Sequence, residues 1–441
     1  MNKENKKFTI GVVGLWHLGT VYAAALAELG QKVIAYDENK KTIFRLRKSQ
    51  LPVEEPGLRE LFQKHFQQGS LRCVLSLKEF GGCDVVWLTL DTPLKKDGGP
   101  DVLALQEALE KIAPHFKQRV VLVVSSQVPI GTGEKFKQII SSLCPKLKFS
   151  YVYQPENLQL GSALASFFKP GRIVLGTDDE FARLTLKKIF APLKSSLLFM
   201  DVASAEMTKH ALNAFLATSL SFIHDIADLC EKYGADVVQV SRALKSDPRI
   251  GEKAYLDASL GFSGGTLGRD LLALLAGADS KKFDLPVIRA AFLKNKYRWQ
   301  IASDFLEKKI KGLNKISVAL LGMTYKPGTS VLRHSLSLKL ADDLRRKVGQ
   351  VRCHDSLASR EEARVAGLNL FADPYEAMKN CSAVLLMTAH PEYLNLDFVK
   401  IAALLNGSKI FYDARNFLWQ KKDEIQQAGL SYYGIGRGKS L

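Results

Sequence analysis

Gly14 and Gly19 stand in the run GVVGLWHLG, between an apolar segment and a helix-like segment, and Asp37 follows about 20 residues later. One glycine permits a tight turn, and the later one lets the following helix pack closely on the strand. Asp37 ends the next apolar segment, where an acid binds the ribose hydroxyls of NAD. Trp16 replaces the middle glycine, and its bulk is expected to obstruct a pyrophosphate unless the turn takes another path. In its strand-turn-helix-strand context, the pattern favours an NAD site over a bare structural turn.

Lys209 and Asn213 are a second pair whose spacing matters. They lie in the segment AEMTKHALNAF, four residues apart, which places both side chains on one face of a helix. On an arbitrary helix they would be interpreted as a solvated lysine and a surface asparagine. Any functional assignment therefore depends on the surrounding sequence.

The segments around these residues alternate between strand-like and helix-like patterns. In the first third we expect a helix over 20–29 and strands over 8–13, 32–36, 84–90 and 119–125. The last two of these strands are rich in β-branched residues and end in turn or polar groups. Strands that alternate with helices indicate a parallel, doubly wound sheet.

The middle of the chain has a different character. Residues 203–233 have the pattern of one long amphipathic helix, and residues 285–311 form another helical stretch. Two long helices without intervening strands indicate a connector that could also carry a dimer interface. From Ile316 the alternation resumes, with four buried strands expected in ISVALLG, QVRCHD, SAVLLMT and KIFYDAR.

The expected fold class is therefore α/β, with two Rossmann-like doubly wound domains joined by a long central helical region. A length of 441 residues suits two or three domains. We place an N-terminal NAD-binding domain at 1–202, a central helical region for dimerisation and substrate at 203–312, and a C-terminal α/β domain at 313–441. The two α/β halves could be distantly similar to each other in structure.

Composition limits the classes of function. The chain is 46% hydrophobic and 24% charged, which suits a globular protein with substantial cores. Its six cysteines form no CxxC pair and no metal-ligand spacing, which is typical of free thiols in a reducing compartment. No run approaches the about 18 apolar residues that are needed to span a bilayer. We therefore expect a cytoplasmic protein without a membrane partner or a bound metal.

The net charge of +17 indicates anionic partners. The basic residues are dispersed, however, and no arginine-rich tail or basic stripe interleaved with aromatic residues is present. Nucleic acid is therefore not expected as a partner. A small phosphorylated substrate would also satisfy the charge.

Further motifs follow one another along nearly the whole chain. They are LPVEEPGLRELF at 51–62, DTPLKKDGGPDV at 91–102, SSQVPIGTG at 125–133, YQPENLQLG at 153–161, FKPGRIVLG at 168–176, AEMTKHALNAF at 205–215, DPRIGEKAYLDASLGFSGGTLGRD at 247–270 and LGMTYKPGTSVLRHS at 321–335. Their order resembles that of the UDP-glucose/GDP-mannose dehydrogenase family, the nucleotide-sugar dehydrogenases. The resemblance implies NAD as cofactor, a UDP-sugar as substrate with a GDP-sugar as second choice, a nucleotide-sugar-binding C-terminal domain, and a homodimer.

The resemblance also implies roles for individual residues. The residues implied in catalysis are Glu156, Lys209, Asn213, Thr266 and Asp270, of which Lys209 and Asn213 contact the sugar and stabilise the oxyanion. Those implied in cofactor binding are Gly14, Trp16, Leu18, Gly19, Asp37, Thr92 and Gln127. Those implied in substrate binding are Arg249, Tyr255, Leu256, Ser259, Phe262, Gly264, Lys326, Arg333 and Arg415. The guanidinium of Arg415 would suit a phosphate, which arginine binds in a bidentate manner.

Three positions depart from the family pattern. Thr266 stands at the position of the nucleophilic cysteine, Leu160 at that of a catalytic glutamate, and Gln127 at that of a threonine that helps to hold the catalytic water. In the family reaction a first hydride transfer gives an aldehyde, the cysteine attacks it as a thiolate, and a second hydride leaves a thioester that water hydrolyses. A threonine hydroxyl is a far weaker nucleophile than a thiolate. The covalent stage is therefore expected to be altered.

Three hypotheses follow from these observations. The leading one is an NAD-dependent oxidoreductase that acts on a CH–OH group of a nucleotide sugar and either stops after two electrons or acts on another carbon. The second is a catalytically inactive nucleotide-sugar binder with a regulatory or partner role, which Trp16 would favour. The third keeps the usual oxidation at carbon six, with Thr266 or a cysteine from elsewhere in the chain as the nucleophile.

Overall fold

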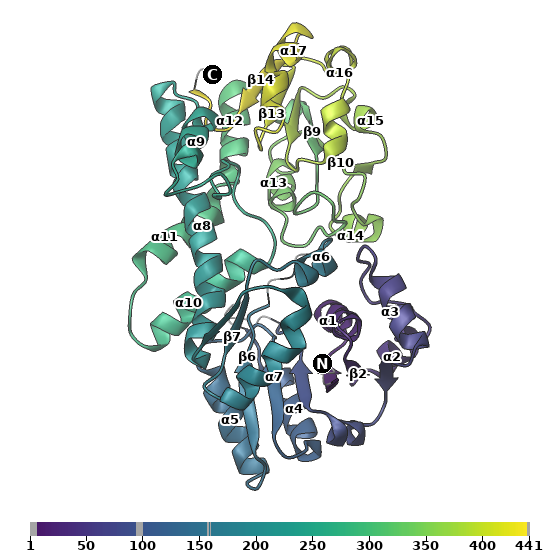
Figure 1. Ribbon diagram of the computed structural model, residues 1–441. Coiled ribbons are helices and arrows are strands. Elements are labelled where there is room, and N and C mark those ends of the chain that lie inside the picture. The colour runs from purple at the N-terminus through teal and green to yellow at the C-terminus, as the bar shows by residue number, and fades with distance from the viewer. Residues whose placement is uncertain (1–6, 94–99, 157, 159, 439–441) are drawn as a thin grey trace. The chain divides into compact units, whose positions relative to one another are not determined.

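The computed structural model describes residues 7–93, 100–156, 158 and 160–438. The chain forms two compact units, Met1–Leu212 and Asn213–Leu441, and each contains its own sheet (Figure 1). The boundary between them falls within one long helix, α8 (Val202–Tyr233). The three-domain division at 1–202, 203–312 and 313–441 remains a prediction.

The first unit is built around an eight-stranded sheet with the strand order β3-β2-β1-β4-β5-β6-β7-β8. All neighbouring strands are parallel except β6 and β7, which are antiparallel. The strands are β1 (Thr9–Val13), β2 (Lys32–Tyr36), β3 (Leu71–Val74), β4 (Val85–Leu88), β5 (Val120–Val124), β6 (Phe149–Tyr153), β7 (Ile173–Gly176) and β8 (Leu197–Met200).

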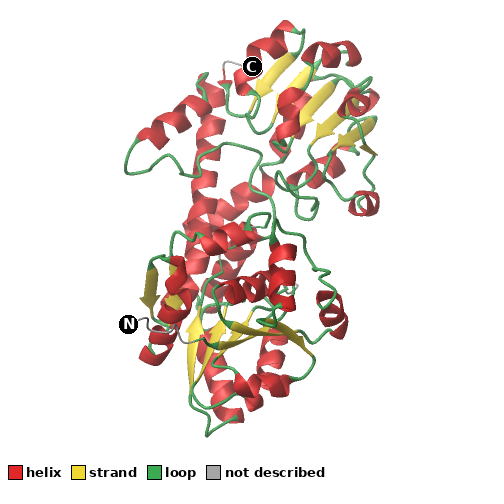
Figure 2. Ribbon diagram, turned by 45° about the vertical axis from the view of Figure 1, so that its right-hand side comes forward, coloured by secondary structure: helices red, strands yellow, loops and turns green. Residues whose placement is uncertain are grey.

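Helices cover both faces of this sheet (Figure 2). Strand β5 illustrates why, because all five of its residues are buried. Its alternate side chains point to opposite faces: Val121 and Val123 belong to the core beneath α1, and Leu122 and Val124 to the core beneath α4 and α5. The helices are α1 (His17–Glu28), α2 (Lys40–Leu46), α3 (Leu58–Gln67), α4 (Leu103–Ile112), α5 (Thr132–Leu143), α6 (Ala163–Phe168) and α7 (Glu180–Phe190), with short 3-10 turns at η1 (Leu77–Gly82), η2 (Ala113–His115) and η3 (Ala191–Leu193).

The second unit begins with helices and continues into a six-stranded parallel sheet of order β11-β10-β9-β12-β13-β14. After α8 come α9 (Val237–Ser246), α10 (Thr266–Ser280), α11 (Pro286–Tyr297) and α12 (Gln300–Lys309). The strands are β9 (Ser317–Leu321), β10 (Gln350–His354), β11 (Leu370–Phe371), β12 (Ala383–Leu386), β13 (Ile410–Asp413) and β14 (Ser431–Gly434). The remaining helices are α13 (Leu336–Leu344), α14 (Arg360–Val365), α15 (Pro374–Met378), α16 (Phe398–Leu404) and α17 (Lys422–Gln427), with 3-10 turns at η4 (Leu313–Lys315), η5 (Pro391–Asn395) and η6 (Trp419–Lys421).

The two sheets share one topology. The order of the first six strands, β3-β2-β1-β4-β5-β6, matches β11-β10-β9-β12-β13-β14, and it is the strand order of the Rossmann fold. The expected fold class, α/β with two Rossmann-like domains and a central helical region, is confirmed.

Some details of the sequence interpretation were wrong. The first helix begins at His17 rather than Thr20, because Trp16 already caps it. The helical stretch at 285–311 is two helices, and the break falls where Arg298 is buried. Its guanidinium donates to the carbonyl oxygen of Ser259 at 2.7 Å and pairs with Asp228 at 2.6 Å. These contacts join residues that are 39 and 70 positions apart in sequence. The spacing of apolar residues within the helix therefore cannot reveal them.

In the described part of the chain, no helix is long and apolar enough to cross a membrane. The same residues contain no group of three or more His, Cys, Asp or Glu side chains that is placed to hold a metal ion.

Candidate functional site

The turn between β1 and α1 requires both of its glycines. Gly14 has φ +91°, in the left-handed region, and a Cβ there would lie 2.9 Å from the backbone nitrogen of Leu90. A Cβ on Gly19 would lie 1.8 Å from the carbonyl oxygen of Gly14. The first glycine thus closes the turn and the second lets α1 approach it. Their contact with the cofactor remains a prediction.

Trp16 is the N-cap of α1 and does not fill the turn. It is 53% exposed, and its carbonyl oxygen accepts hydrogen bonds from the backbone nitrogen and the hydroxyl of Thr20, at 3.1 Å and 2.7 Å. Leu18, two residues further, packs partly buried against the core. The turn therefore forms without any conflict with the indole. The predicted obstruction concerns only the approach of a ligand.

Asp37 follows β2 and is tied into the same turn. Its Oδ2 accepts a hydrogen bond from the backbone nitrogen of Leu15 at 2.7 Å, and its Oδ1 accepts one from Asn39 at 2.9 Å. Each carboxylate oxygen can accept more than one hydrogen bond, and the residue is half-buried. Asp37 can therefore hold the turn and still bind ribose hydroxyls.

The other predicted cofactor residues follow further strands of this sheet. Thr92 comes after β4 and Gln127 after β5, and the predicted catalytic residue Glu156 comes after β6. The carboxyl ends of parallel strands meet at one edge of a sheet, which is where ligands bind in open α/β folds. The first unit thus gathers these residues, with Gly14 and Asp37, along one edge.

The segment after β5 is fastened to α8 by two side chains that the sequence interpretation missed. The Oε2 of Glu206 accepts a hydrogen bond from Gly131 N at 2.6 Å, and its Oε1 accepts one from Gly133 N at 2.8 Å. The Nε2 of His210 lies 2.9 Å from the carbonyl oxygen of Val128. Burial raises the pKa of Glu206, although the two amides oppose the shift. The sequence did contain a signal for these two contacts, because Glu206 and His210 are polar residues four positions apart and so lie on one face of the predicted helix.

Replacing Glu206 by alanine is expected to destabilise the first unit. The change leaves two amides at the start of α5 without their acceptor, and an unsatisfied buried group costs about 1–3 kcal/mol. We expect the free energy of unfolding in urea to fall by roughly 2–4 kcal/mol. Glu134→Ala removes an exposed acid from α5 and is the control, with an effect within about 0.5 kcal/mol. Equal stability of the two variants would contradict the role given to Glu206.

Lys209 contacts Glu156 within the first unit. Its Nζ donates a hydrogen bond to the carbonyl oxygen of Glu156, whose carboxylate accepts one from the backbone nitrogen of Leu158. Lys209 is only 8% exposed, so its ammonium group is held in place. Leu160 is half-buried and brings no carboxylate to this segment.

Asn213 and Asp270 contact each other in the second unit. The Nδ2 of Asn213 donates a hydrogen bond to the Oδ2 of Asp270, and both residues are buried. Thr266 is the first residue of α10, one turn before Asp270, and it is exposed. The partial positive charge of a helix N-terminus lowers the pKa of a thiol, but a threonine hydroxyl stays protonated at neutral pH.

A pocket in the second unit lies beside the carboxyl ends of β9, β12 and β13. Tyr325 and Lys326 follow β9, Met387 and Thr388 follow β12, and Arg415 follows β13. The connections from β9 and β12 run to opposite sides of the sheet, and this switch point is where open α/β sheets bind ligands. Two predicted substrate residues, Lys326 and Arg415, line the pocket and suit an anionic phosphate. The other lining residues are Leu260, Gly261, Ser263, Pro327, Leu336 and Ser337.

The loop before α10 is held in place by its neighbours in this unit. The backbone nitrogen of Phe262 donates to the Oδ1 of Asn295 at 2.7 Å. Gly264 lies against the ring of Tyr325, where a Cβ would be 2.9 Å from Cδ2. Leu256, at the start of the loop, is buried in the core. The predicted residues Leu256, Phe262 and Gly264 thus shape the loop from which Gly261 and Ser263 reach the pocket.

Ser259 is anchored by a buried histidine. Its hydroxyl lies 3.3 Å from the Nε2 of His224, which is 0% exposed. Burial, together with the positive charges of Arg298, Arg415 and Lys294, holds the pKa of His224 well below its usual value. His224 is therefore neutral near pH 7 and acts as a hydrogen-bonding partner rather than as a charge.

Three further predicted substrate residues neither line this pocket nor belong to the buried part of its loop. The side chain of Arg249 is 88% exposed and pairs with Asp247 at 2.7 Å. Tyr255 is 46% exposed, and Arg333 is also exposed. The structure of this unit does not bring them together with Lys326, and their contact with substrate remains a prediction.

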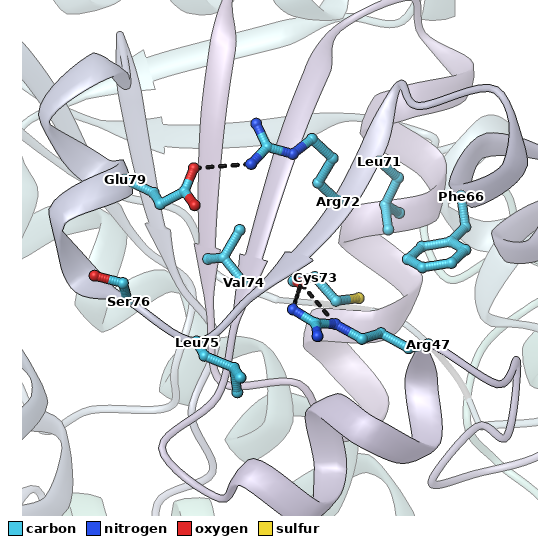
Figure 3. Close-up of a pocket in the computed structure, with 9 residues that line it drawn as sticks. All are labelled: Arg47, Phe66, Leu71, Arg72, Cys73, Val74, Leu75, Ser76 and Glu79. Atoms are coloured by element: carbon cyan, nitrogen blue, oxygen red, sulfur yellow. Dashed lines mark hydrogen bonds and ion pairs between the residues drawn. The ribbon is translucent and has the colours of Figure 1, made fainter.

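A hollow of about 480 Å³ lies along β3, at the free edge of the first sheet (Figure 3). Arg47 donates to the carbonyl oxygen of Cys73 from Nε at 3.1 Å and from Nη2 at 2.7 Å, and Arg72 pairs with Glu79 at 2.9 Å. Both guanidinium groups are thus engaged within the protein. None of the predicted site residues lines this hollow, which is formed by Arg47, Phe66, Leu71, Arg72, Cys73, Val74, Leu75, Ser76 and Glu79.

Known proteins match this chain along nearly its whole length. Models of the UDP-glucose/GDP-mannose dehydrogenase family match in order: the NAD binding domain at 8–194, the central domain at 203–297 and the UDP binding domain at 319–420. UDP-glucose 6-dehydrogenase YwqF of Bacillus subtilis is 32% identical over 432 residues, 97% of each chain. UDP-glucose 6-dehydrogenase of Rhizobium meliloti is 33% identical over 438 residues, 97% of this chain and 99% of that protein.

Solved structures agree with this result. A UDP-glucose dehydrogenase from Pyrobaculum islandicum has a TM-score of 0.89 at 30% identity and covers 99% of both chains. A UDP-D-ManNAc dehydrogenase from Pyrococcus horikoshii, at 24% identity and a TM-score of 0.85, shares the fold. The protein is a member of the UDP-glucose/GDP-mannose dehydrogenase family, with NAD as the cofactor of its first domain.

Proposed function

We propose that the protein oxidises a CH–OH group of a UDP-sugar with NAD as the acceptor, and that it stops after one hydride transfer. The observation that carries the first part is similarity over 97% of the chain to proteins named UDP-glucose 6-dehydrogenase. The match of residues 319–420 to a UDP binding domain supports UDP over GDP as the nucleotide. Lys326 and Arg415, at the pocket of the second unit, are the proposed phosphate contacts.

The residues present fit the chemistry of a single oxidation. NAD, when bound, accepts the hydride that leaves the carbon bearing the hydroxyl. Lys209 and Asn213 are assigned to donate hydrogen bonds to the hydroxyl oxygen as it gains negative charge. Asp270 orients the amide of Asn213 and is assigned to take up the hydroxyl proton through a water. Glu156 positions the ammonium of Lys209 through its carbonyl oxygen.

The limit to two electrons rests on Thr266. A second oxidation needs the aldehyde to be captured by a nucleophile, and we assign Thr266 to the position where the family has its cysteine. A threonine hydroxyl needs a positioned base to act as a nucleophile, and Thr266 is an exposed residue at the first position of α10. Leu160 and Gln127 stand where the family has a catalytic glutamate and a threonine that helps to hold the water. The later hydrolysis step would therefore lack both of these side chains. For oxidation at carbon six, the expected product is therefore an aldehyde.

A panel of UDP-, GDP- and TDP-sugars with NAD tests the activity. We expect NADH absorbance to rise with a UDP-sugar, and both UDP and NAD to raise the melting temperature because each binds the native state. If UDP and NAD raise the melting temperature but no sugar yields NADH, the protein is the inactive binder of the second hypothesis. That result would contradict the proposal.

We also infer a homodimer through α8. Phe215, Phe222 and Leu229 lie seven residues apart on one face of this helix and are 70%, 48% and 53% exposed. A stripe of large apolar side chains at this spacing is typical of a helix–helix contact. A second copy of the chain would bury it.

Changing Phe215 and Phe222 together to lysine is expected to produce a monomer. Each of the two chains would have to bury two charges in the contact, which costs far more than the apolar burial they replace contributes. Light scattering after size exclusion should show half of the wild-type mass. Phe44→Lys, at a residue 50% exposed in the first unit, is the control and should keep the dimer mass. A double variant that remains dimeric would exclude this face as the interface.

A further inference from the structure

The first turn of each sheet is built in the same way. In both, a glycine with positive φ is followed by a residue whose amide donates to the aspartate that comes at the end of the next strand. Leu15 N donates to Asp37 Oδ2 at 2.7 Å, and Met323 N donates to Asp355 Oδ2 at 2.7 Å. The second turn is also held by the buried side chain of His390.

Asp355 is engaged on both oxygens by the protein itself. Its Oδ2 accepts hydrogen bonds from the backbone nitrogen and hydroxyl of Thr324, at 2.8 Å and 2.9 Å, and its Oδ1 accepts from Leu357 N and Ala358 N at 2.9 Å and 3.0 Å. Burial alone would raise the pKa of Asp355, but hydrogen bonds from His390 and the backbone hold the pKa well below its usual value. Unlike the half-buried Asp37, this aspartate is a fixed internal ion.

His390 is the additional group. It lies after β12, is 1% exposed, and places its Nε2 3.1 Å from Asp355 Oδ2 and 2.9 Å from Thr324 Oγ1. Thr388, two residues earlier, donates from its hydroxyl to the carbonyl oxygen of Thr324 at 2.7 Å. The segment after β12 therefore holds Thr324 through both its side chain and its backbone.

Thr324 directly precedes two pocket residues. Tyr325 and Lys326 line the pocket at the carboxyl ends of β9 and β12, and the hydroxyl of Thr324 also lies 3.4 Å from the carbonyl oxygen of Lys326. A contact that fixes Thr324 consequently fixes the path of the next two residues. His390 itself is not among the residues that line the pocket.

We propose that His390 is a positioning residue for nucleotide binding, because it holds Thr324 and so sets Tyr325 and Lys326 against the bound nucleotide. The inference rests on the proposed function, in which this pocket takes the UDP part of the substrate. His390 needs no contact with the substrate in this role. Small displacements of binding groups weaken recognition even when the displaced residue keeps its own chemistry.

The test compares His390→Phe with His390→Gln. Phenylalanine fills a similar volume but makes no hydrogen bond, whereas the amide nitrogen of glutamine has two N–H groups that can donate to Asp355 Oδ2 and Thr324 Oγ1. We expect His390→Phe to raise the Kd for UDP, measured by calorimetry, about tenfold. The KM for the nucleotide sugar should rise by a similar factor, and kcat and the KM for NAD should stay near wild type. His390→Gln should recover most of the affinity.

His354→Phe is the matched control. His354 is also a buried histidine of this unit, 3% exposed, with its Nδ1 3.0 Å from the hydroxyl of Tyr393. The variant His354→Phe should lower the melting temperature without changing the Kd for UDP. If His390→Phe fails to fold, Thr324→Val removes the contact between His390 and Thr324 from the other side and should also weaken UDP binding.

The outcomes separate the two proposals. Wild-type protein that binds no UDP would overturn the proposed function and this inference together. Wild-type protein that binds UDP, with His390→Phe or Thr324→Val binding equally well, would overturn the inference alone. Equal weakening by phenylalanine and glutamine would also overturn it, because hydrogen bonding would then not be the cause.

Discussion

Lys209→Ala is expected to lower the rate of NADH formation by about 10²–10⁴-fold, the usual contribution of a group that donates to the reacting oxygen or moves its proton. The ammonium of Lys209 is nearly buried and directed by the carbonyl oxygen of Glu156. No water-exposed side chain can replace such a fixed donor. The effect should appear in kcat, because the contact matters most when the hydroxyl oxygen carries negative charge.

Binding of the two ligands should survive this change. UDP and NAD should still raise the melting temperature of Lys209→Ala by nearly their wild-type amounts. Lys232→Ala removes an exposed lysine from the same helix and should leave turnover unchanged. Wild-type turnover in Lys209→Ala would remove Lys209 from the mechanism.

Gly19→Ala is expected to abolish the stabilisation by NAD while stabilisation by UDP persists. A Cβ at this position would lie 1.8 Å from the carbonyl oxygen of Gly14 and 2.7 Å from the hydroxyl of Thr89. Since the first neighbour is backbone, α1 must move away from the turn, at a cost of about 1–3 kcal/mol. That movement separates the amides at the start of α1 from the turn that should bind the pyrophosphate.

The ligand-induced shifts in melting temperature are the measurement. Gly171→Ala is the control, because a Cβ at Gly171 meets no heavy atom within 4 Å, and it should respond to both ligands like wild type. If Gly19→Ala retains the full NAD shift, the turn after β1 is not where NAD binds.

Local sequence patterns predicted the fold where each element contains its own signal. Gly14, Gly19 and Asp37 have a fixed spacing around one turn, and strands such as β5 are continuous apolar runs. Strands β3, β6, β7, β8, β11 and β14 were not expected. Of these, β3, β11 and β14 have between two and four residues with exposed or half-buried positions among them, so their pairing with neighbouring strands decides their conformation. The break at Arg298 likewise depends on distant partners.

The same distinction applies to the site. Two residues predicted from local motifs, Lys326 and Arg415, lie at one pocket, and their contact with substrate remains a prediction. The residues that fasten the loops were missed. Glu206 contacts residues more than 70 positions away. Glu55 also has distant partners, since it accepts hydrogen bonds from His17 Nε2, 38 residues away, at 2.7 Å and from Gly161 N, 106 residues away, at 2.7 Å. A buried acid can be recognised in a sequence only when its partner is known.

Mass spectrometry of the product, with NADH counted in the same reaction, tests the central claim most directly. The protein would be incubated with NAD and UDP-glucose until the reaction stops. One NADH for each sugar consumed, with an aldehyde as the product, is the result that a single hydride transfer without a thiol nucleophile predicts. Two NADH for each sugar, with a uronic acid as the product, would show that covalent capture proceeds without a cysteine at residue 266 and would contradict the account.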